Sequence, residues 1–326
     1  RNNFMLQWNK LGQIFNPIQM DTPSWMREYG QLPIPIELND DTLRIYFATR
    51  TQKDANSQYI SNTAYIDVCK KNQKEIKTIS SQPIFQLGEP GTFDEFGCMP
   101  NCLVQIEEEK RLYYTGWTRK QSVPYATSIG VASSVDGGES FKKCGTGPII
   151  GISFLEPFFM SGAEVKKING IWNMWYSTGL KWLYDSNNKI YEPIYQIVHA
   201  TSADGIYWER NGLPIIPPLS ENECQNCFTL FKNKDLWHAI FCYRKGMDFR
   251  KNHENSYRLG YAYSADLKNW VRDDNKVNID VSNTGWDSQM ICYPKIGKIN
   301  ERIYLYYCGN EFGREGFGYA ELIGSE

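Results

Sequence analysis

The sequence is poor in histidine, has no long apolar run and carries almost no net charge. Three histidines occur among 326 residues, and no two have the spacing of paired metal ligands. No run of 18 apolar residues is present, so no transmembrane span is expected. The formal net charge is −2, with acidic and basic residues interspersed, which argues against a nucleic-acid or membrane-surface partner. We expect neither a metal nor any other cofactor.

The nine cysteines also lack the even number and regular spacing of a secreted disulfide framework. Cys98 with Cys102, and Cys224 with Cys227, have spacings that two halves of a zinc site could have. No histidine adjoins them, so packing as small apolar side chains is the preferred interpretation. The sequence therefore predicts reduced cysteines in a cytoplasmic protein.

No long amphipathic helical pattern is present either. Aromatic residues are abundant (16 Phe, 21 Tyr and 10 Trp), and Gly and Pro separate short apolar runs. This composition favours strands and turns over helices.

Short aromatic strands recur along the whole chain at a nearly constant interval. Their anchor residues are Tyr46, Tyr113, Trp175, Ile240 and Tyr306, which are 67, 62, 65 and 66 residues apart. In the middle three units a further strand follows and ends in Ala-x-Ser-x-Asp, as in "VASSVDGG", "HATSADG" and "YAYSADL". A strand followed by an Asp-Gly turn indicates a hairpin. Five such units account for the chain, which favours one closed array over two domains.

Five small antiparallel sheets can bury both of their faces only against one another. Radial packing achieves this, so we predict an all-β, five-bladed β-propeller that occupies residues 1–326 as a single domain. The innermost strands are expected at 31–37, 98–104, 160–166, 225–231 and 290–296. We also expect N-terminal residues to join the last blade, because a closed ring leaves no free sheet edge.

Acidic residues precede most of the predicted innermost strands. The residues at these positions are Arg27 and Glu28, Asp94 and Glu95, Glu156, Glu223, and Asp287. Equivalent positions in a propeller lie on a ring about its axis, so we expect these side chains to meet in one pocket at one end of the channel.

The repeat resembles the five-bladed propeller superfamily that includes arabinanases, xylosidases, invertases and mannoside phosphorylases. The segments "GTFDEFGCMP", "DGGESF", "EPFF", "IWNMWYSTGLKW", "SADGIYW", "GWDSQMICYP" and "YYCGNEFGREGFGYA" are similar to a group of uncharacterised bacterial propeller proteins linked to surface-polysaccharide synthesis. The resemblance covers nearly the whole chain. It implies a carbohydrate-active enzyme that acts at a glycosidic bond.

Cleavage of a glycosidic bond by this chemistry needs one carboxylic acid and a second carboxylate. Asp94, Glu156 and Asp287 come from different blades and are the candidate catalytic residues, with Glu156 as acid and Asp94 as base. Crowded carboxylates raise one another's pKa, which would keep one protonated. Taken singly, each has a simpler interpretation as a turn or backbone cap.

Sugar recognition requires aromatic faces and planar hydrogen-bond donors. Several residues that follow the anchor strands could supply them, and packing is the safer interpretation for Trp117. Together with the residues before the innermost strands, the candidate substrate-binding set is Arg27, Glu28, Arg50, Glu95, Trp182, Glu223, Tyr243, Arg244 and Asn310.

The sequence departs from the hydrolase pattern at two positions. Arabinanase-like members have Asp before a Pro in the first blade and after a Pro in the second, where this chain has Leu32 and Asn101. Either the carboxylates have moved, or the reaction is phosphorolysis or glycosyl transfer. The alternative ligand is then a phosphorylated or nucleotide sugar bound by arginines. A third possibility is a non-catalytic propeller that binds a glycan or a protein.

Overall fold

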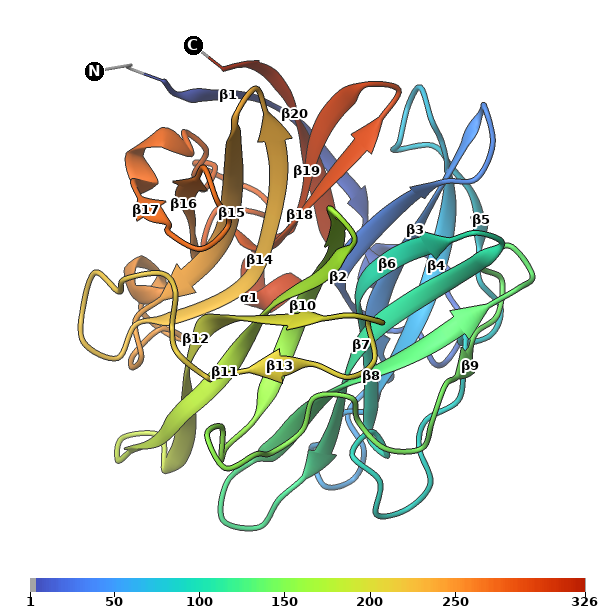
Figure 1. Cartoon of the computed structure of the whole chain (residues 1–326). Coiled ribbons are helices and arrows are strands. Elements are labelled where there is room, and N and C mark those ends of the chain that lie inside the picture. Colours follow the sequence, from blue (N-terminus) through green and yellow to red (C-terminus); the bar gives the residue numbers. More distant parts are fainter. Residues whose placement is uncertain (1–3, 326) are drawn as a thin grey trace.

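The computed structural model describes residues 4–325, which form five four-stranded antiparallel blades arranged around a central channel (Figure 1). A single parallel pair, Ser61 with Gly97, joins the first two blades. From the channel outward, the first blade contains β2 (Glu28–Glu37), β3 (Thr42–Arg50), β4 (Ser61–Cys69) and β5 (Ile76–Ile79). The second contains β6 (Gly97–Ile106), β7 (Glu109–Arg119), β8 (Tyr125–Ser134) and β9 (Lys142–Lys143). The third contains β10 (Met160–Ile168), β11 (Ile171–Asp185), β12 (Ile190–Ser202) and β13 (Glu209–Arg210).

The last two blades follow the same order. The fourth contains β14 (Cys224–Asn233), β15 (Leu236–Arg244), β16 (Arg258–Ser264) and β17 (Val271–Arg272). The fifth contains β18 (Cys292–Ile299), β19 (Arg302–Cys308) and β20 (Phe317–Ser325), and its outermost strand is β1 (Leu6–Phe15). The remaining elements are η1 (Pro17–Gln19), η2 (His253–Asn255), η3 (Asp274–Lys276) and α1 (Asn310–Gly313). The predicted fold class, innermost segments and N-terminal closure are confirmed.

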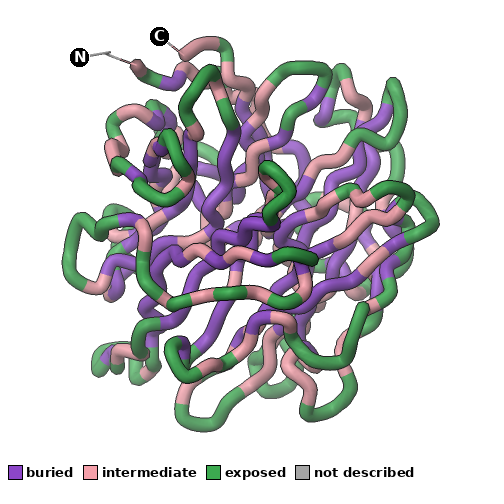
Figure 2. Tube along the Cα trace, viewed as in Figure 1, coloured by how far each residue is buried: buried purple, intermediate pink, exposed green. Residues whose placement is uncertain are grey.

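Strands in the middle of each blade are apolar on both faces because each blade packs between two others. Leu43, Ile45 and Phe47 on β3 are fully buried, and so are Tyr46 and Ala48 on its other face. Figure 2 shows the same distribution over the molecule, with buried segments along the strands and exposed ones in the loops. The sandwiched sheets therefore explain why the anchor segments read as continuous apolar runs.

The Ser-x-Asp segments form the turns at the outer edges of the blades, as the sequence predicts. Asp136 accepts hydrogen bonds from the backbone N–H of Glu139 and Ser140, and the Ser134 hydroxyl donates to it. Asp204 and Asp266 accept the equivalent backbone bonds in the next two blades. These aspartates are thereby assigned to turn structure.

Each innermost strand carries a β-bulge, and the bulges lie at corresponding places in the five blades. The pairing register shifts between Gln31 and Ile34, Pro100 and Cys102, Ser161 and Glu164, Asn226 and Thr229, and Cys292 and Lys295. Leu32, Cys227 and Tyr293 have φ values of 57°, 53° and 53° there, in the left-handed region that such side chains rarely adopt. A bulge changes the direction in which nearby side chains point, and strained bulges are common beside functional sites.

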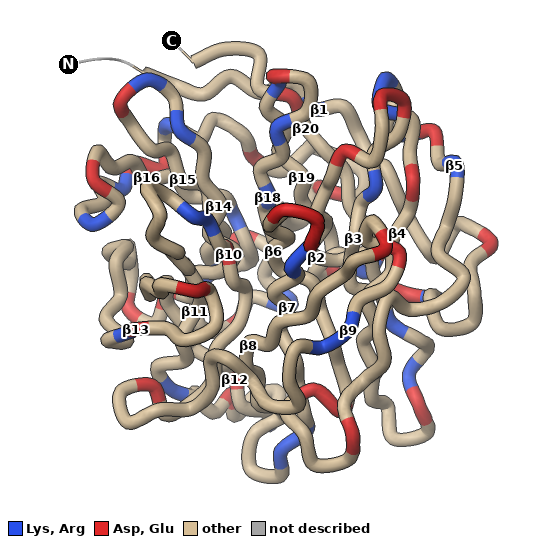
Figure 3. The backbone as a smooth tube through the Cα atoms, turned by 45° about the vertical axis from the view of Figure 1, so that its right-hand side comes forward, with Lys and Arg blue, Asp and Glu red and all other residues tan. Residues whose placement is uncertain are grey.

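Charged residues of both signs are interspersed over the trace (Figure 3). All nine cysteines lie in the described part of the chain and are unpaired. Within residues 4–325, no helix has the length and apolar character needed to cross a membrane.

Candidate functional site

A cavity of about 470 Å³ opens at the end of the channel where the innermost strands begin and the second strands end. Residues of all five blades line it, including Gln31, Asn101, Ser161, Asn226 and Tyr293. This volume lies within the range of small-molecule sites. The convergence of five blades at one cavity agrees with the expected location of the site.

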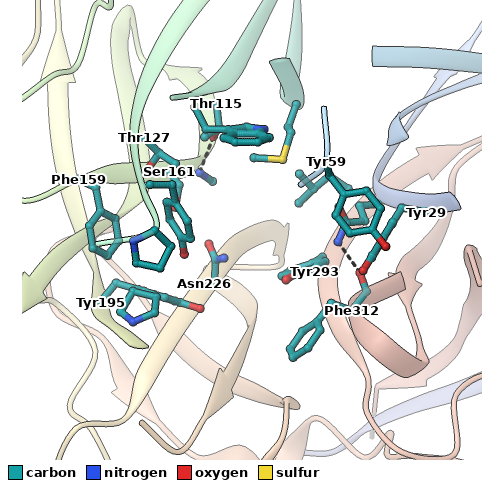
Figure 4. Close-up of a pocket in the computed structure, with 18 of the residues that line it drawn as sticks. Tyr29, Tyr59, Thr115, Thr127, Phe159, Ser161, Tyr195, Asn226, Tyr293 and Phe312 are labelled. Carbon is teal, nitrogen blue, oxygen red and sulfur yellow. Dashed lines mark hydrogen bonds between the residues drawn. The ribbon is translucent and has the colours of Figure 1, made fainter. Parts of the chain in front are cut away.

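The bulges of the innermost strands form the floor of the cavity. Asn226 projects into it between aromatic side chains, and Thr115 donates a 2.6 Å hydrogen bond to Asn101 Oδ1 (Figure 4). Below this floor the channel narrows to a small pocket, where Lys295 Nζ lies 3.0 Å from Glu164 Oε2 and donates to the Asn101 carbonyl. This buried ion pair links the third and fifth blades.

One wall of the cavity contains Arg50 and Arg119 together with tyrosines. The Arg50 guanidinium lies over the rings of Tyr29 and Tyr59, with its central carbon 4.2 and 5.0 Å from their centres. Arg50 makes no ion pair with any described carboxylate, and its Nε is buried without a hydrogen-bond acceptor. Arg119 donates to the Tyr59 carbonyl and lies 3.6 Å from Asp54. Of the two arginines on this wall, only Arg119 therefore has an acidic partner.

A second wall contains Arg244 and Arg250, which flank the ring of Phe249. Their guanidinium carbons lie 3.7 and 4.9 Å from its centre. Arg250 forms a bidentate pair with Glu192, at 2.7 and 3.0 Å. Arg244 is only 3% exposed. It donates to the carbonyls of Lys245 and Pro193 and has no carboxylate partner among the described residues. Here too, only one of the two arginines has an acidic partner.

Aromatic rings and neutral hydroxyls complete the lining. Tyr29 and Tyr59 lie on one side in Figure 4, and Phe159 and Tyr195 lie on the other. Burial, and then neighbouring Tyr29 and Glu28, raise the pKa of Tyr59 to about 12, so its hydroxyl stays protonated at neutral pH. Trp117 also lines the cavity. Its place depends on Gly97, where a Cβ would come 1.5 Å from the indole nitrogen.

No Asp, Glu or His is among the described residues that line the cavity. The expectation that Asp94, Glu156, Glu223 and Asp287 share a solvent-filled pocket is therefore wrong. Each of these carboxylates is at most 3% exposed. Each points outward along its own blade and reaches a base on the outermost strand.

The second blade illustrates this arrangement. Asp94 lies 2.7 Å from Lys143 Nζ on β9 and accepts a 2.8 Å hydrogen bond from Tyr114 on β7. Burial, and then the Asp94 carboxylate, raise the pKa of Tyr114, so the phenol remains a donor. The carboxylate is thus compensated within one sheet.

Three other blades have a similar network, with a tyrosine donor in two of them and a glutamine donor in the third. Glu156 pairs with Arg210 at 3.0 Å and accepts from Tyr176. Asp287 pairs with Lys10 at 2.9 Å and accepts from Tyr307. Glu223 forms a bidentate pair with Arg272 and accepts from Gln225. The recurring acids therefore tie the innermost strand of a blade to the outermost one.

Of the nine predicted substrate-binding residues, Arg50 and Arg244 line the cavity, and the others do not. Glu28 is paired with Arg314, Glu95 accepts from Thr118, and Asn310 bonds the backbone of Gln289 and Gly285. Trp182 packs on Tyr125 and Phe159, which places it behind the cavity wall. Tyr243 lies against Arg272, and Arg27 is exposed.

The sequence prediction also missed functional candidates. Arg119, Arg250, Tyr29, Tyr59 and Tyr195 all line the cavity. One signal was available for the arginines, because Arg50 and Arg119 end β3 and β7 as Arg244 ends β15. Arg250 lies in a loop, and no periodic pattern marks it.

Comparison with known proteins identifies close relatives over the full length. The chain is 31% identical over 321 residues to the uncharacterized protein MT1551 of Mycobacterium tuberculosis (strain CDC 1551 / Oshkosh), covering 97% of this chain and 99% of the relative. It is 30% identical over 319 residues to the uncharacterized protein Rv1502 of Mycobacterium tuberculosis (strain ATCC 25618 / H37Rv), with the same coverage. The chain belongs to this family. No protein-family model matches the chain.

Solved structures similar to this family member are propeller glycoside hydrolases and related enzymes. A glycoside hydrolase superposes with a TM-score of 0.74 at 15% identity, covering 98% of this chain and 93% of its own. A structure from the mannoside phosphorylase family, which contains glycoside hydrolases that target β-1,2-mannosidic linkages in Candida mannan, has a TM-score of 0.70 at 15% identity, with 98% and 95% coverage. An exo-1,5-α-L-arabinanase from a bovine ruminal metagenomic library has a TM-score of 0.60 at 9% identity, with 93% and 94% coverage. At these identities the likeness establishes the fold.

Proposed function

We propose that the protein is a carbohydrate-active propeller that binds a phosphorylated or nucleotide-activated sugar in the central cavity and transfers its glycosyl group. The observation that carries this proposal is the lining itself, which contains four arginines and no carboxylate. A ligand that complements this lining has an apolar sugar face for the aromatic rings and an anionic group for the guanidinium groups.

The same lining argues against two-carboxylate hydrolysis. A sugar or alcohol leaving group needs a proton from a carboxylic acid, and the second step needs another carboxylate. A phosphate leaving group departs as an anion, and positioned arginines stabilise its charge without a proton donor. In the proposed transfer, the C1–O bond to phosphate breaks and its electron pair leaves with the phosphate. A hydroxyl oxygen of an acceptor sugar bonds to C1, and its proton passes to the departing phosphate.

Two further features support a carbohydrate ligand. The solved structures with the same fold include glycoside hydrolases and a mannoside phosphorylase family member. Asn101, Asn226, Thr115 and Ser161 add planar amides and hydroxyls to the lining, which suits recognition of sugar hydroxyls. We also propose, from the pattern of its cysteines, that the protein is cytoplasmic.

Binding and turnover should be measured on the same panel of compounds. Neutral monosaccharides, glycosyl phosphates and nucleotide sugars are titrated by calorimetry, and phosphate or nucleotide release is followed with and without acceptor oligosaccharides. We expect anionic sugars to bind more tightly than neutral ones, with affinity that falls as salt rises. Cleavage of neutral glycosides without added phosphate would refute the proposal. Tight binding of anionic sugars with no transfer to any acceptor would favour the non-catalytic alternative.

A further inference from the structure

The four arginines of the cavity are not equivalent, and the difference assigns the anion-binding groups. Arg250 has a bidentate partner in Glu192, and Arg119 has Asp54 at 3.6 Å. Arg50 and Arg244 have no carboxylate partner among residues 4–325. On each wall, therefore, one guanidinium group has a carboxylate partner and the other has none.

Arg244 stands out among the buried charges of the protein. Arg44, the other arginine with 3% exposure, has its guanidinium in a bidentate pair with Asp67. Leaving a buried charge without a counter-ion costs several kcal/mol, roughly 3–5 where it has been measured by removing one partner. Arg244 bears that cost while lining a cavity. An anionic ligand group would supply the missing counter-ion.

Arg50 has a separate, independent indication of a missing partner. Its Nε is buried and has no acceptor, as is also true of Arg119, and its guanidinium lies over the rings of Tyr29 and Tyr59. Contact with the two rings restrains the guanidinium, and its terminal N–H groups can make a planar two-point contact with phosphate or carboxylate.

The two uncompensated arginines belong to different sides of the cavity. Arg50 ends β3 of the first blade, and Arg244 ends β15 of the fourth, which is not adjacent to the first in the ring. Tyr59 and Tyr195 face each other across the cavity in Figure 4, with Asn226 between them. We therefore expect a single anionic group that engages one of these arginines to leave the other without a counter-ion.

We propose that the cavity binds a carbohydrate with two separated anionic groups, one held by Arg50 and the other by Arg244, with the sugar ring between the aromatic walls. This inference rests on the proposed function and narrows its ligand class. Two phosphates, or a phosphate and a uronate carboxylate, have the required chemistry. A second phosphate carries more negative charge than a carboxylate, so probes that differ in this group distinguish the two ligands.

The test compares ligands that differ by one anionic group. Glucose, glucose 1-phosphate, glucose 6-phosphate, glucose 1,6-bisphosphate and glucuronic acid 1-phosphate are titrated into the full chain by calorimetry. We expect at least one doubly anionic probe to bind tenfold or more tightly than either monophosphate. The better of the two doubly anionic probes indicates which second group the site prefers.

Variants then assign each group. Arg50→Gln and Arg244→Gln should each reduce the affinity for the doubly anionic probe to that for a monophosphate, and the double variant should bind glucose and its phosphates alike. Arg302→Gln is the matched control, because Arg302 lies on β19 and is largely exposed. Circular dichroism checks folding, and the partly exposed Arg50 provides a second test if Arg244→Gln fails to fold.

Two outcomes would overturn the inference, and they differ from failure of the proposed function. If monophosphates bind as tightly as every doubly anionic probe, the two-point inference is wrong while anionic-sugar binding stands. If both variants retain the tenfold preference, the assignment to Arg50 and Arg244 is wrong. If glucose binds as tightly as all its phosphates, the proposed function itself fails.

Discussion

Buried charges have counter-ions inside the blades, whereas a buried charge at the central cavity has none among the described residues. Inside the blades, Asp94, Glu156, Glu223 and Asp287 each have a basic partner on the outermost strand. In the cavity, Arg244 is equally buried and has no counter-ion. A buried pair holds two strands in register, whereas a buried lone charge lowers stability unless a ligand completes it. The contrast separates residues that serve the fold from residues available to a ligand.

The largest expected effect comes from breaking a fully buried pair. Arg44→Met should lower the free energy of unfolding by about 3–5 kcal/mol, because Asp67 is left buried without its bidentate partner. Urea denaturation measures this loss. Arg302→Met is the control, since its exposed pair should contribute less than about 1 kcal/mol. Equal losses in the two variants would mean that burial does not set the strength of these pairs.

Asp94→Asn tests whether the recurring acids serve the fold. We expect a loss of about 3 kcal/mol, because Lys143 loses its partner while the amide can still accept from Tyr114. Ligand affinity in the cavity should stay within twofold of the parent. The neighbouring Glu95→Gln change should be nearly neutral in stability. A stable Asp94→Asn protein with turnover abolished would restore Asp94 as a catalytic candidate.

The histidines offer a third way to bury a titratable group, which is to keep it neutral. Burial lowers the pKa of both His199 and His238 to about 4. The unfolded chain takes up these protons near pH 6.5, whereas the folded chain resists until about pH 4. Their contribution to stability is therefore complete above pH 6.5 and is lost progressively as the pH falls toward 4. At pH 5 the loss is up to about 2 kcal/mol per histidine.

This pH effect can be isolated with a variant. His238→Gln should flatten the decline in unfolding free energy between pH 7 and pH 5 relative to the parent, measured by urea denaturation at both values. Carboxylates titrate mostly at lower pH and are common to both proteins. An unchanged slope would show that His238 is protonated in the folded state.

The smallest expected change in stability is at Arg244. Arg244→Met should leave the unfolding free energy within about 1 kcal/mol of the parent, because the loss of two bonds to backbone carbonyls is offset by removal of an uncompensated charge. The same variant should bind anionic sugars much more weakly. Differential scanning calorimetry gives the first quantity and titration calorimetry the second. A loss comparable to that of Arg44→Met would place Arg244 with the residues that serve the fold.

The fold was readable from the sequence because each blade repeats a local pattern. The anchors from Tyr46 to Tyr306 mark second strands, and the segments before them form the innermost strands. The repeated acids were also detected, but their partners were not. Lys143, Arg210 and Arg272 lie on two-residue outer strands some fifty positions downstream, too short to show a pattern. The repeated acids before the innermost strands therefore suggested a shared pocket. The same repetition is expected when each acid makes an equivalent contact within its own blade.

The cavity was only partly predictable. Arg50, Trp117 and Arg244 stand four residues after their anchors and line it, but Asn310 has the same spacing and bonds to a neighbouring turn instead. Tyr59, Phe249 and Arg250 lie in loops whose paths depend on the packed structure. Spacing from an anchor predicts the end of the channel at which a residue lies. The loop conformations determine which of these side chains face the cavity.

Closure of the ring by β1 has a consequence for how the protein forms. Among the described strands β1 pairs only with β20, so the two can meet only after all the strands between them have been made. Contacts so distant in sequence form slowly. Until they form, β20 presents an open edge, and Asp287 lacks Lys10, its partner on β1. The charges of the fifth blade are therefore balanced only when β1 pairs with β20. A chain stalled before that step exposes an unpaired acid and an unpaired strand edge that is prone to aggregate.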